Sequence, residues 1–423
     1  MTTARVTRTV VLDDDPTGTQ AASDAPVLFG HDAGALIDVL RDDRCVYMQT
    51  NSRALDEPTA VALARDIRRA ALEAAGQLGV GVRFVLRGDS TLRGHVFAES
   101  AVFMEHDAVL LFVPAFPEGG RETKNGSHYL RQGGDLVPVQ HTEFARDPVF
   151  GYSTSDLVEF TRLRSGRKAV LVRLDEVRAG GTAEAILAAP AGSVVLADAE
   201  LDTDISLIAQ GIEAAWTRRP LVVRSAAPLA AELAGVRSGR YLEPADLGLA
   251  GHPLVVCGSH TDGARVQLRC LTDDLGPATV LRSDEALRDP EVTGLRAAAA
   301  ERRIQRPSGA RVIATERDRS DRRATLADGA AVMTSLVTAA RALVSDADVV
   351  VLKGGITSAE VIRHALGATR ARVIGQMQPG VSMWRVVASD GRDVPCIIVP
   401  GNMGSPDVLQ RAVAACARSG TVT

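Results

Sequence analysis

Short apolar runs alternate with longer amphipathic stretches along the first half of the chain. The runs are four to six residues long and rich in Val, Leu and Ala, which is typical of buried strands. They cover residues 9–12, 45–50, 83–86, 108–113, 169–174, 193–198 and 221–224. Between them lie stretches such as PTAVALARDIRRAALEAAG (58–76), which has a helical period and a proline suited to the first turn. This alternation predicts a mainly parallel sheet with helices on its faces.

The same rhythm restarts in the second half, after the stretch SGRYLEPADLGLAGHP (238–253), which is punctuated by Gly and Pro and is interpreted as a linker. The later apolar runs lead into glycine-rich turns and cover residues 254–259, 278–282, 311–315, 348–355 and 395–402. We therefore predict an α/β protein with two α/β domains, residues 1–240 and 252–423, each with a mainly parallel sheet. Ligands often bind between two such domains, so we expect the active site in an inter-domain cleft.

Charge and cysteine content exclude several classes of protein. The chain of 423 residues carries 48 Lys and Arg against 52 Asp and Glu, and this net charge of -4 argues against a general nucleic-acid-binding surface. The five cysteines form no C-x-x-C pair, so a disulfide framework or a zinc site is not expected. No segment approaches the ~18 apolar residues of a membrane helix, and the N-terminus has no apolar signal region. We expect a soluble, cytoplasmic protein.

Polar side chains gather where the predicted strands of the first domain end. Asp13, Asp14 and Asp15 follow the first run, and Ser52 and Arg53 follow the second. The next two strand ends carry Arg87, Asp89, Ser90, Thr91, Arg93 and His95, and then Glu118, Arg121, Lys124, Asn125 and His128. In open α/β sheets the chemistry lies beyond the carboxyl ends of the strands. Arginine forks match carboxylates and aspartates accept hydrogen bonds from hydroxyls, so a small acid that carries hydroxyl groups would satisfy this set.

Each polar cluster also has a purely structural interpretation. A single aspartate after a strand most often caps the following turn, although three in succession exceed what capping needs. Asp89 and Arg93 are four residues apart and could form an ordinary surface ion pair. Because four such clusters follow four strand ends, we favour a binding site over four separate structural roles.

The second domain offers three glycine-rich turns that lead from strands into helices. They contain Gly258 and Ser259, the segment 354–358, and the segment 401–405. Glycines let backbone N–H groups approach a ligand, and helix N-termini favour negative charge, so the three loops could cradle a nucleotide polyphosphate. Each loop alone is also ordinary α/β turn chemistry. The sequence lacks a P-loop, a G-x-G-x-x-G fingerprint, H-E-x-x-H and G-x-S-x-G, which disfavours the corresponding enzyme classes.

Several of these motifs carry a resemblance to a known family. They are D-D-x-T-G at 14–18, Ser52-Arg53, D-S-T-L-R-G at 89–94, PAFPEGGR at 114–121, Gly258-Ser259, the Gly-Gly loop at 354–358 and P-G-x-x-G at 400–404. In this combination the chain resembles the four-carbon acid sugar kinase family, which phosphorylates threonate, erythronate and oxo-tetronate type acids with ATP. It differs from the family pattern at Asp13, where a small residue is common, and at Ile356, where an acidic residue is frequent.

The resemblance implies that the first domain binds the sugar acid and the second binds ATP. It makes Asp14 or Asp15 the base that accepts the proton of the terminal hydroxyl, with the other orienting the substrate or a water of the Mg²⁺ shell. Arg93, with Arg53, would hold the substrate carboxylate. The implied substrate-binding residues are Thr17, Ser52, Arg53, Asp89, Ser90 and Arg93. The implied nucleotide-binding residues are Ser259, Gly354, Gly355, Ile356, Thr357, Ser358, Gly401, Asn402 and Gly404.

The implied cofactors are ATP and Mg²⁺, and few direct protein ligands to the metal are expected because Mg²⁺ keeps several waters. The expected partners are small molecules, without nucleic acid or membrane, and a homodimer is one option for the assembly. Other functions stay open: a kinase for another small hydroxy acid, such as glycerate or a longer aldonate, or a regulator that binds nucleotide or sugar acid without turnover. A dehydrogenase with an atypical cofactor loop is a more distant option.

Overall fold

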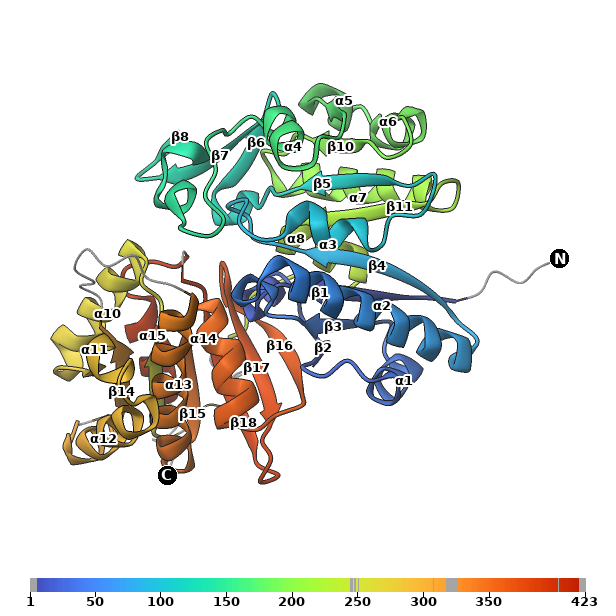
Figure 1. Ribbon diagram of the computed structural model, residues 1–423. Coiled ribbons are helices and arrows are strands. Elements are labelled where there is room, and N and C mark those ends of the chain that lie inside the picture. The colour runs from blue at the N-terminus through green and yellow to red at the C-terminus, as the bar shows by residue number, and fades with distance from the viewer. Residues whose placement is uncertain are drawn as a thin grey trace. The chain divides into compact units, whose positions relative to one another are not determined.

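The computed structural model describes residues 6–243, 246, 249, 251–306, 308–316, 326–401 and 403–417. The chain divides into two compact units, Met1–Ser238 and Gly239–Thr423. Strands of mostly parallel sheet form the centre of each unit, and the ribbon in Figure 1 follows the chain through them from blue to red.

A parallel sheet forms the centre of the first unit. Along this sheet the described strands lie in the order β2-β3-β1-β4-β11-β5-β10-β9, and each neighbouring pair runs parallel. Their bounds are β1 (Thr7–Asp13), β2 (Ala25–Leu28), β3 (Cys45–Gln49), β4 (Gly81–Arg87), β5 (Val109–Val113), β9 (Ala169–Val172), β10 (Val194–Ala197) and β11 (Leu221–Ser225). In a parallel sheet all carboxyl ends meet at one edge, which places the polar segments after β1, β3 and β4 side by side.

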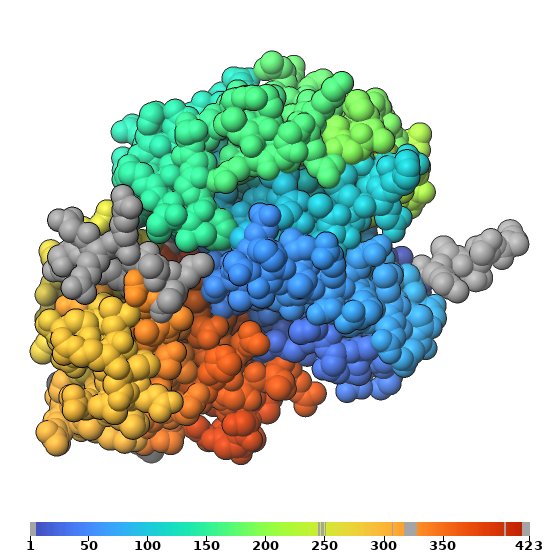
Figure 2. Space-filling view, viewed as in Figure 1, coloured from blue at the N-terminus to red at the C-terminus, as the bar shows by residue number. Residues whose placement is uncertain are grey.

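Helices connect these strands and cover the sheet. They are α1 (Ala33–Asp42), α2 (Glu57–Leu78), α3 (Val96–Ala101), α4 (Leu157–Ser165), α5 (Leu174–Arg178), α6 (Thr182–Ala188), α7 (Asp202–Trp216) and α8 (Ala227–Ala234), with short 3₁₀ turns at Pro16–Thr19 and Ser52–Ala54. The longest, α2, begins where the Asp56 side chain accepts a hydrogen bond from Thr59 N, and it ends at Gly79 in the left-handed region. Its buried face is mostly alanine, so the helix packs closely, and its outer side forms part of the surface in Figure 2 (blue).

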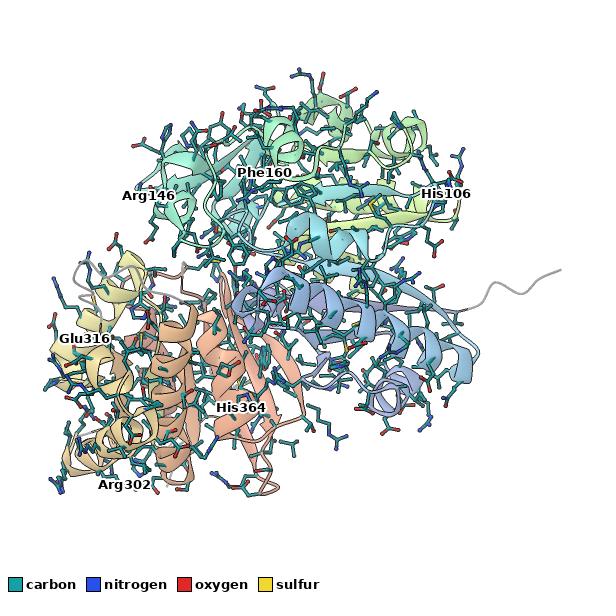
Figure 3. All side chains as sticks on the ribbon, in the orientation of Figure 1. His106, Arg146, Phe160, Arg302, Glu316 and His364 are labelled. Carbon is teal, nitrogen blue, oxygen red and sulfur yellow. The ribbon has the colours of Figure 1, made fainter. Side chains whose placement is uncertain are left out.

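Aromatic side chains fill the core of the first unit beneath α4. Phe160 of α4, labelled in Figure 3, has its ring centroid 5.9 Å from Phe97, 6.2 Å from Phe112 and 6.1 Å from Tyr152. These separations are those of favourable aromatic pairs. Few aromatics occur in this chain, and this group anchors the connection between β5 and β9.

A small antiparallel sheet is inserted after β5. It consists of β6 (Arg121–Lys124), β7 (Ser127–Gln132) and β8 (Asp135–Pro138). Turns with Gly126 and with Gly133 and Gly134, all at positive φ, connect these strands. The insertion carries Arg121, Lys124, Asn125 and His128 of the predicted polar segment, so these residues lie in a hairpin that the sequence rhythm did not indicate.

The second unit also has a central sheet, and its described strands lie in the order β13-β14-β12-β15-β18-β17-β16. The pairs from β13 to β18 are parallel, and β18, β17 and β16 are antiparallel to one another. The bounds are β12 (Pro253–Cys257), β13 (Thr279–Leu281), β14 (Arg311–Thr315), β15 (Val349–Lys353), β16 (Arg370–Gln378), β17 (Val381–Val387) and β18 (Asp393–Val399). The helices are α10 (Asp262–Leu275), α11 (Ser283–Ala286), α12 (Pro290–Arg303), α13 (Leu326–Leu343), α14 (Gly355–Glu360) with a π-helical turn at Val361–Ala365, and α15 (Val408–Ala417).

The predicted α/β architecture is confirmed, and each apolar run predicted as a strand overlaps one. The prediction missed β2, the β6–β8 hairpins and the pair β16–β17. These strands are short or carry polar residues at alternate positions, so they lack the continuous apolar run of a buried parallel strand. Part of the predicted linker, residues 244, 245, 247, 248 and 250, lies outside the described residues. The described helices include none that is both long and apolar enough to cross a membrane.

Candidate active site

Three of the predicted polar clusters meet at the carboxyl edge of the first sheet. Asp13 is the last residue of β1, and the strand register pairs it with Gln49 of β3 on one side and Arg87 of β4 on the other. The segments that begin after these strands, with Asp14, Ser52 and Asp89, therefore start from neighbouring points. The parallel register alone thus explains why residues 75 positions apart share one site.

Asp13 is fully buried in the floor of this site. Its carboxylate accepts hydrogen bonds from Gln49 Nε2 at 2.8 Å and from Arg87 Nη1 at 3.1 Å. Burial raises its pKa to about 7, although the positive charge of Arg87 acts in the opposite direction. A Cβ on Gly18 would overlap this carboxylate, so the glycine of the D-D-x-T-G motif makes room for Asp13.

Asp15 caps the short helix that follows it. Its Oδ1 accepts hydrogen bonds from Thr17 N at 2.7 Å and from Thr17 Oγ1, and Pro16 occupies the first turn. The other oxygen forms an ion pair with Arg53. The capping interpretation of the aspartate run therefore applies to Asp15, and the Thr17 hydroxyl is engaged by it.

Asp14 differs from both neighbours because one of its oxygens is not hydrogen-bonded. Its Oδ1 accepts a hydrogen bond from Arg87 Nη1 at 3.0 Å. Its Oδ2 is buried and lacks a hydrogen-bond partner, although Arg53 Nε lies 3.4 Å away. A buried carboxylate oxygen without a donor is costly, and it is a natural acceptor for a proton or a hydroxyl.

Asp89, the first residue of the D-S-T-L-R-G motif, forms ion pairs with two arginines. Its Oδ2 accepts hydrogen bonds from Arg93 Nε at 2.7 Å and from Thr91 Oγ1, and its Oδ1 lies 3.8 Å from Arg53 Nη1. Burial alone would raise the pKa of Asp89, but Arg93 and Arg53 together hold it well below its usual range. The Asp89–Arg93 pair is thus a largely buried element of the cluster and not a surface ion pair.

Arg93 is also fixed from its other side. Its guanidinium lies 4.9 Å from the ring centroid of Phe144, and Nη1 lies 3.7 Å from Asp147 Oδ2. The side chains of Arg93 and Arg53 are 18% and 12% exposed, whereas those of Asp14 and Asp15 are 2% exposed. The arginines are therefore the more accessible to solvent, and the aspartates lie beneath them.

The two predicted serines are both buried. Ser52 Oγ has no hydrogen-bond partner, which leaves a hydroxyl available beside Arg53. Ser90 is held by its backbone, since His128 Nε2 lies 2.8 Å from the Ser90 carbonyl oxygen. Burial lowers the pKa of His128 to about 4, so this imidazole is neutral and serves as a support.

Sequence reasoning did not assign roles to several arginines of this cluster. Arg87 bridges Asp13 and Asp14, and Arg121 is a buried cation whose pKa burial lowers to about 10. Arg224 of β11 forms a hydrogen bond of 2.7 Å with Glu99 of α3 and lies 3.7 Å from Asp14 Oδ2. For Arg87 and Arg224 a signal was present, because each lies within a buried strand, where a charged residue requires a buried partner.

In the second unit, the loops after β12, β15 and β18 converge. A Cβ on Gly258 would overlap Thr357 Oγ1, one on Gly354 would lie 3.3 Å from Ser259 Cβ, and one on Gly401 would lie 2.6 Å from Ser259 Oγ. Gly354 also has a φ of 112°. The glycines thus allow three backbone segments to approach closely around Ser259, as a polyphosphate cradle requires.

Buried polar side chains hold these loops in place. Lys353 Nζ donates a hydrogen bond to the Pro400 carbonyl. Gln267 Nε2 lies 2.9 Å from the Gly404 carbonyl and 3.1 Å from those of Met403 and Ser405. The backbone carbonyls of the P-G-x-x-G loop therefore accept hydrogen bonds from two side chains that the sequence analysis did not select.

The remaining predicted nucleotide-binding residues differ in their surroundings. Ile356 is exposed, Gly355 begins α14, and Ser358 Oγ donates within the helix to the Gly354 carbonyl at 2.7 Å. Gly404 has a φ of 96° and packs against Val408. Asn402 lies outside the described residues.

The described part of the chain contains no group of three or more His, Cys, Asp or Glu side chains placed to hold a metal ion. In the first unit the clustered aspartates are paired with arginines, although Asp14 Oδ2 accepts no hydrogen bond.

Two family models match this chain. The family model described as "Sugar-binding N-terminal domain" matches residues 9–233, and the model "Nucleotide-binding C-terminal domain" matches residues 254–409. A D-threonate kinase of Bordetella bronchiseptica is 30% identical over 390 residues, which are 90% of this chain and 88% of the relative. A 3-oxo-tetronate kinase of Methylobacterium radiotolerans is 27% identical, over 87% of this chain and 88% of its own. The structure of a Haemophilus influenzae protein of the family DUF1537 has the same fold, with a TM-score of 0.61, 17% identity, and coverage of 96% of this chain and 100% of that one.

Proposed function

This chain belongs to the four-carbon acid sugar kinase family, and we propose that it transfers the terminal phosphoryl group of ATP to the terminal hydroxyl of a four-carbon sugar acid. The observation that carries this proposal is the pair of Asp14 and Asp15 beneath Arg53 and Arg93. A carboxylate substrate needs cations, and its hydroxyl needs a proton acceptor close by. The names of the relatives support a tetronate or an oxo-tetronate as the acid.

We assign the role of proton acceptor to Asp14. Asp15 uses its Oδ1 as a helix cap, and its Oδ2 pairs with Arg53. Asp14 Oδ2 has no hydrogen-bond partner. Because this oxygen accepts no hydrogen bond in the free protein, it can accept one from the substrate hydroxyl without breaking another.

Arg53 and Arg93 would bind the substrate carboxylate. Both are more exposed than the aspartates, and both form ion pairs with Asp89, which orients their side chains. When Arg53 turns from the aspartates toward the substrate, it would uncover Asp14. Substrate binding would then create the reactive site, which limits the wasteful hydrolysis of ATP.

The loops after β12, β15 and β18 would bind the nucleotide, with Ser259, Gly354, Thr357 and Gly401 closest to the phosphates. Phosphoryl transfer depends mostly on positioning and on stabilising charge, so rigid loops suit it. A Mg²⁺ ion bound to the phosphates would neutralise their charge. The side chains of Gln267 and Lys353 contribute by fixing the loop at Gly401–Gly404.

An ADP-release assay over a panel of acids tests this function. The panel contains threonate, erythronate, a 3-oxo-tetronate, glycerate and a longer aldonate, each with ATP and Mg²⁺. We expect the highest kcat/KM with a four-carbon acid. A preference for glycerate or the longer aldonate would make the chain a kinase for another hydroxy acid, and binding without ADP release from any acid would make it a regulator.

A further inference from the structure

Arg224 is a buried arginine on β11 that belongs to no motif of the sequence analysis. It is 2% exposed, and its Nη1 donates a hydrogen bond of 2.7 Å to Glu99 Oε2 of α3. An arginine in a central strand must have a strong reason to remain there, because burying its charge is expensive.

The Glu99 bond satisfies only part of the guanidinium. Arg224 Nε and Nη2 are both buried and have no hydrogen-bond acceptor. Nη2 lies 3.7 Å from Asp14 Oδ2, the carboxylate oxygen that also lacks a partner. An unused donor thus faces an unused acceptor across a gap slightly too long for a hydrogen bond.

The R-G-D-S-T-L-R-G segment is shaped around Arg224. A Cβ on Gly88 would lie 2.5 Å from Arg224 Nε, and one on Gly94 would lie 3.5 Å from both Arg224 Nη2 and Asp14 Oδ2. Glycine at position 88 is therefore needed to admit the guanidinium. The most specific motif of the site accommodates a residue more than 100 positions away.

Asp14 lies between two arginines that come from opposite faces of the sheet. Arg87 pairs with Ser225, the neighbour of Arg224, so the side chains of Arg87 and Arg224 leave opposite faces. Each arginine has a second carboxylate behind it, Asp13 for Arg87 and Glu99 for Arg224. Charges therefore alternate across the sheet edge, with Asp14 at the centre.

A purely structural ion pair does not explain this arrangement. A fold-stabilising pair would use the whole fork of the arginine, whereas two of its three nitrogens are left without acceptors here. The unused edge is directed toward Asp14 and the two motif glycines.

We propose that Arg224, held by Glu99, is a positioning residue for Asp14: it keeps a fixed positive charge beside Oδ2, so that this oxygen stays directed at the substrate hydroxyl. The inference rests on the proposed function, because it takes Asp14 as the proton acceptor. Glu99 limits the effect by keeping Arg224 from forming a direct hydrogen bond that would weaken Asp14 as a base. Arg53 and Arg87 also pair with Asp14, and the same two arginines bring Asp13, Asp15 and Asp89 into its surroundings.

The two members of the pair should have opposite effects on the pH dependence of kcat/KM for the sugar acid. Arg224→Met removes the positive charge and should move the acid limb of the profile, its low-pH side, to higher pH by about one unit. Arg224→Lys keeps the charge, so its acid limb should lie close to that of the wild-type protein. Glu99→Gln keeps a hydrogen-bond acceptor for Arg224 but removes the negative charge, so it should move the limb to lower pH. Loss of packing alone would lower activity at every pH and would not produce opposite shifts.

Arg306→Met is the matched control, because Arg306 and Glu301 form an equally buried pair in the second unit. We expect it to lower Tm and to leave the acid limb where it is. If the wild-type protein is active and neither Arg224→Met nor Glu99→Gln shifts the acid limb, this inference is overturned while the proposed function stands. Because Glu99→Gln changes few atoms, it tests the idea even if Arg224→Met does not fold.

A double-mutant cycle keeps the inference testable if the wild-type protein turns over no acid, an outcome that contradicts the proposed function. Asp14→Asn and Arg224→Lys, alone and together, are compared by thermal unfolding. Non-additive changes in Tm would support the contact between the two side chains. Additive changes would contradict it, whatever the activity.

Discussion

Three consecutive aspartates have three different environments at the end of β1. Asp13 is buried against Gly18 and shares Arg87 with Asp14, Asp15 caps the next turn, and Asp14 keeps one oxygen without a donor. The repulsion between them is offset by arginines that reach the edge from β3, β4 and β11. Each aspartate should therefore respond differently to the same isosteric substitution.

Asp14→Asn should lower kcat by about 100-fold or more, because an amide cannot take the proton of the hydroxyl. Its affinity for ATP, measured by calorimetry, should stay close to that of the wild-type protein. Asp15→Asn should lose less activity, since asparagine is also a good helix cap. A larger loss in Asp15→Asn, or an equal loss of ATP affinity in Asp14→Asn, would reverse the assignment.

Arg93→Ala should raise the KM for the sugar acid by about 10-fold to 100-fold, the value of a charge-assisted hydrogen bond to a carboxylate. The KM for ATP should not change. Arg162→Ala is the control, because Arg162 forms an exposed ion pair with Glu159 in the same unit. An unchanged KM for the acid would remove Arg93 from the site.

Asp13 should make stability depend on pH. Because burial raises its pKa from 3.8 to about 7, the native state holds a proton that the unfolded chain has lost between these values. Stability contributed by this group therefore falls as pH rises through the window, by about 4 kcal/mol in total. Asp13→Asn should remove that slope. Parallel curves of the free energy of unfolding for the two proteins, from about pH 4 to about pH 8, would show that Asp13 is ionised throughout.

The sequence indicated most of the residues that meet at this edge, but it did not indicate which aspartate pairs with which arginine. Motif spacing selected Asp14, Arg53, Asp89 and Arg93 because they follow strand ends, and the parallel register brings such ends together. It could not select Arg224, whose strand contributes no polar loop and whose partner Glu99 lies on a helix 125 positions away. Contacts of that kind depend on strand order, which the apolar pattern does not contain.

At the scale of elements, the apolar runs predicted the parallel strands because these are buried on both faces. The missed strands β6 to β8 and β16 to β17 contain polar residues, and β2 has only four residues, so a prediction from continuous apolar runs does not find them. The hairpin β6–β8 matters for the site, because it carries Arg121 and His128 next to Asp89 and Ser90.

The three glycine loops give a prediction at this scale. Gly401→Ala should raise the KM for ATP by about 10-fold, because the added Cβ would push Ser259 out of position, while the KM for the acid stays the same. Gly263→Ala, in the first turn of α10 with open space around it, should be neutral or slightly stabilising. Equal effects of the two substitutions on the KM for ATP would argue that the loops do not bind nucleotide.

At the scale of the whole molecule, the two units carry complementary chemistry. The first offers carboxylates beneath arginines, which suits a hydroxy acid, and the second offers glycine loops, which suit a polyphosphate. The family models match the same two regions, residues 9–233 and 254–409. Under the proposed function both halves would be needed, because phosphoryl transfer requires an activated hydroxyl and a bound donor.

The most direct test of the account is the proton-coupled ³¹P spectrum of the product formed from ATP, Mg²⁺ and D-threonate or another four-carbon acid of the panel. The account predicts ADP and a phosphate ester whose signal is a triplet, because the terminal carbon carries two protons. Inorganic phosphate as the sole new signal, or a doublet from a secondary hydroxyl, would contradict it.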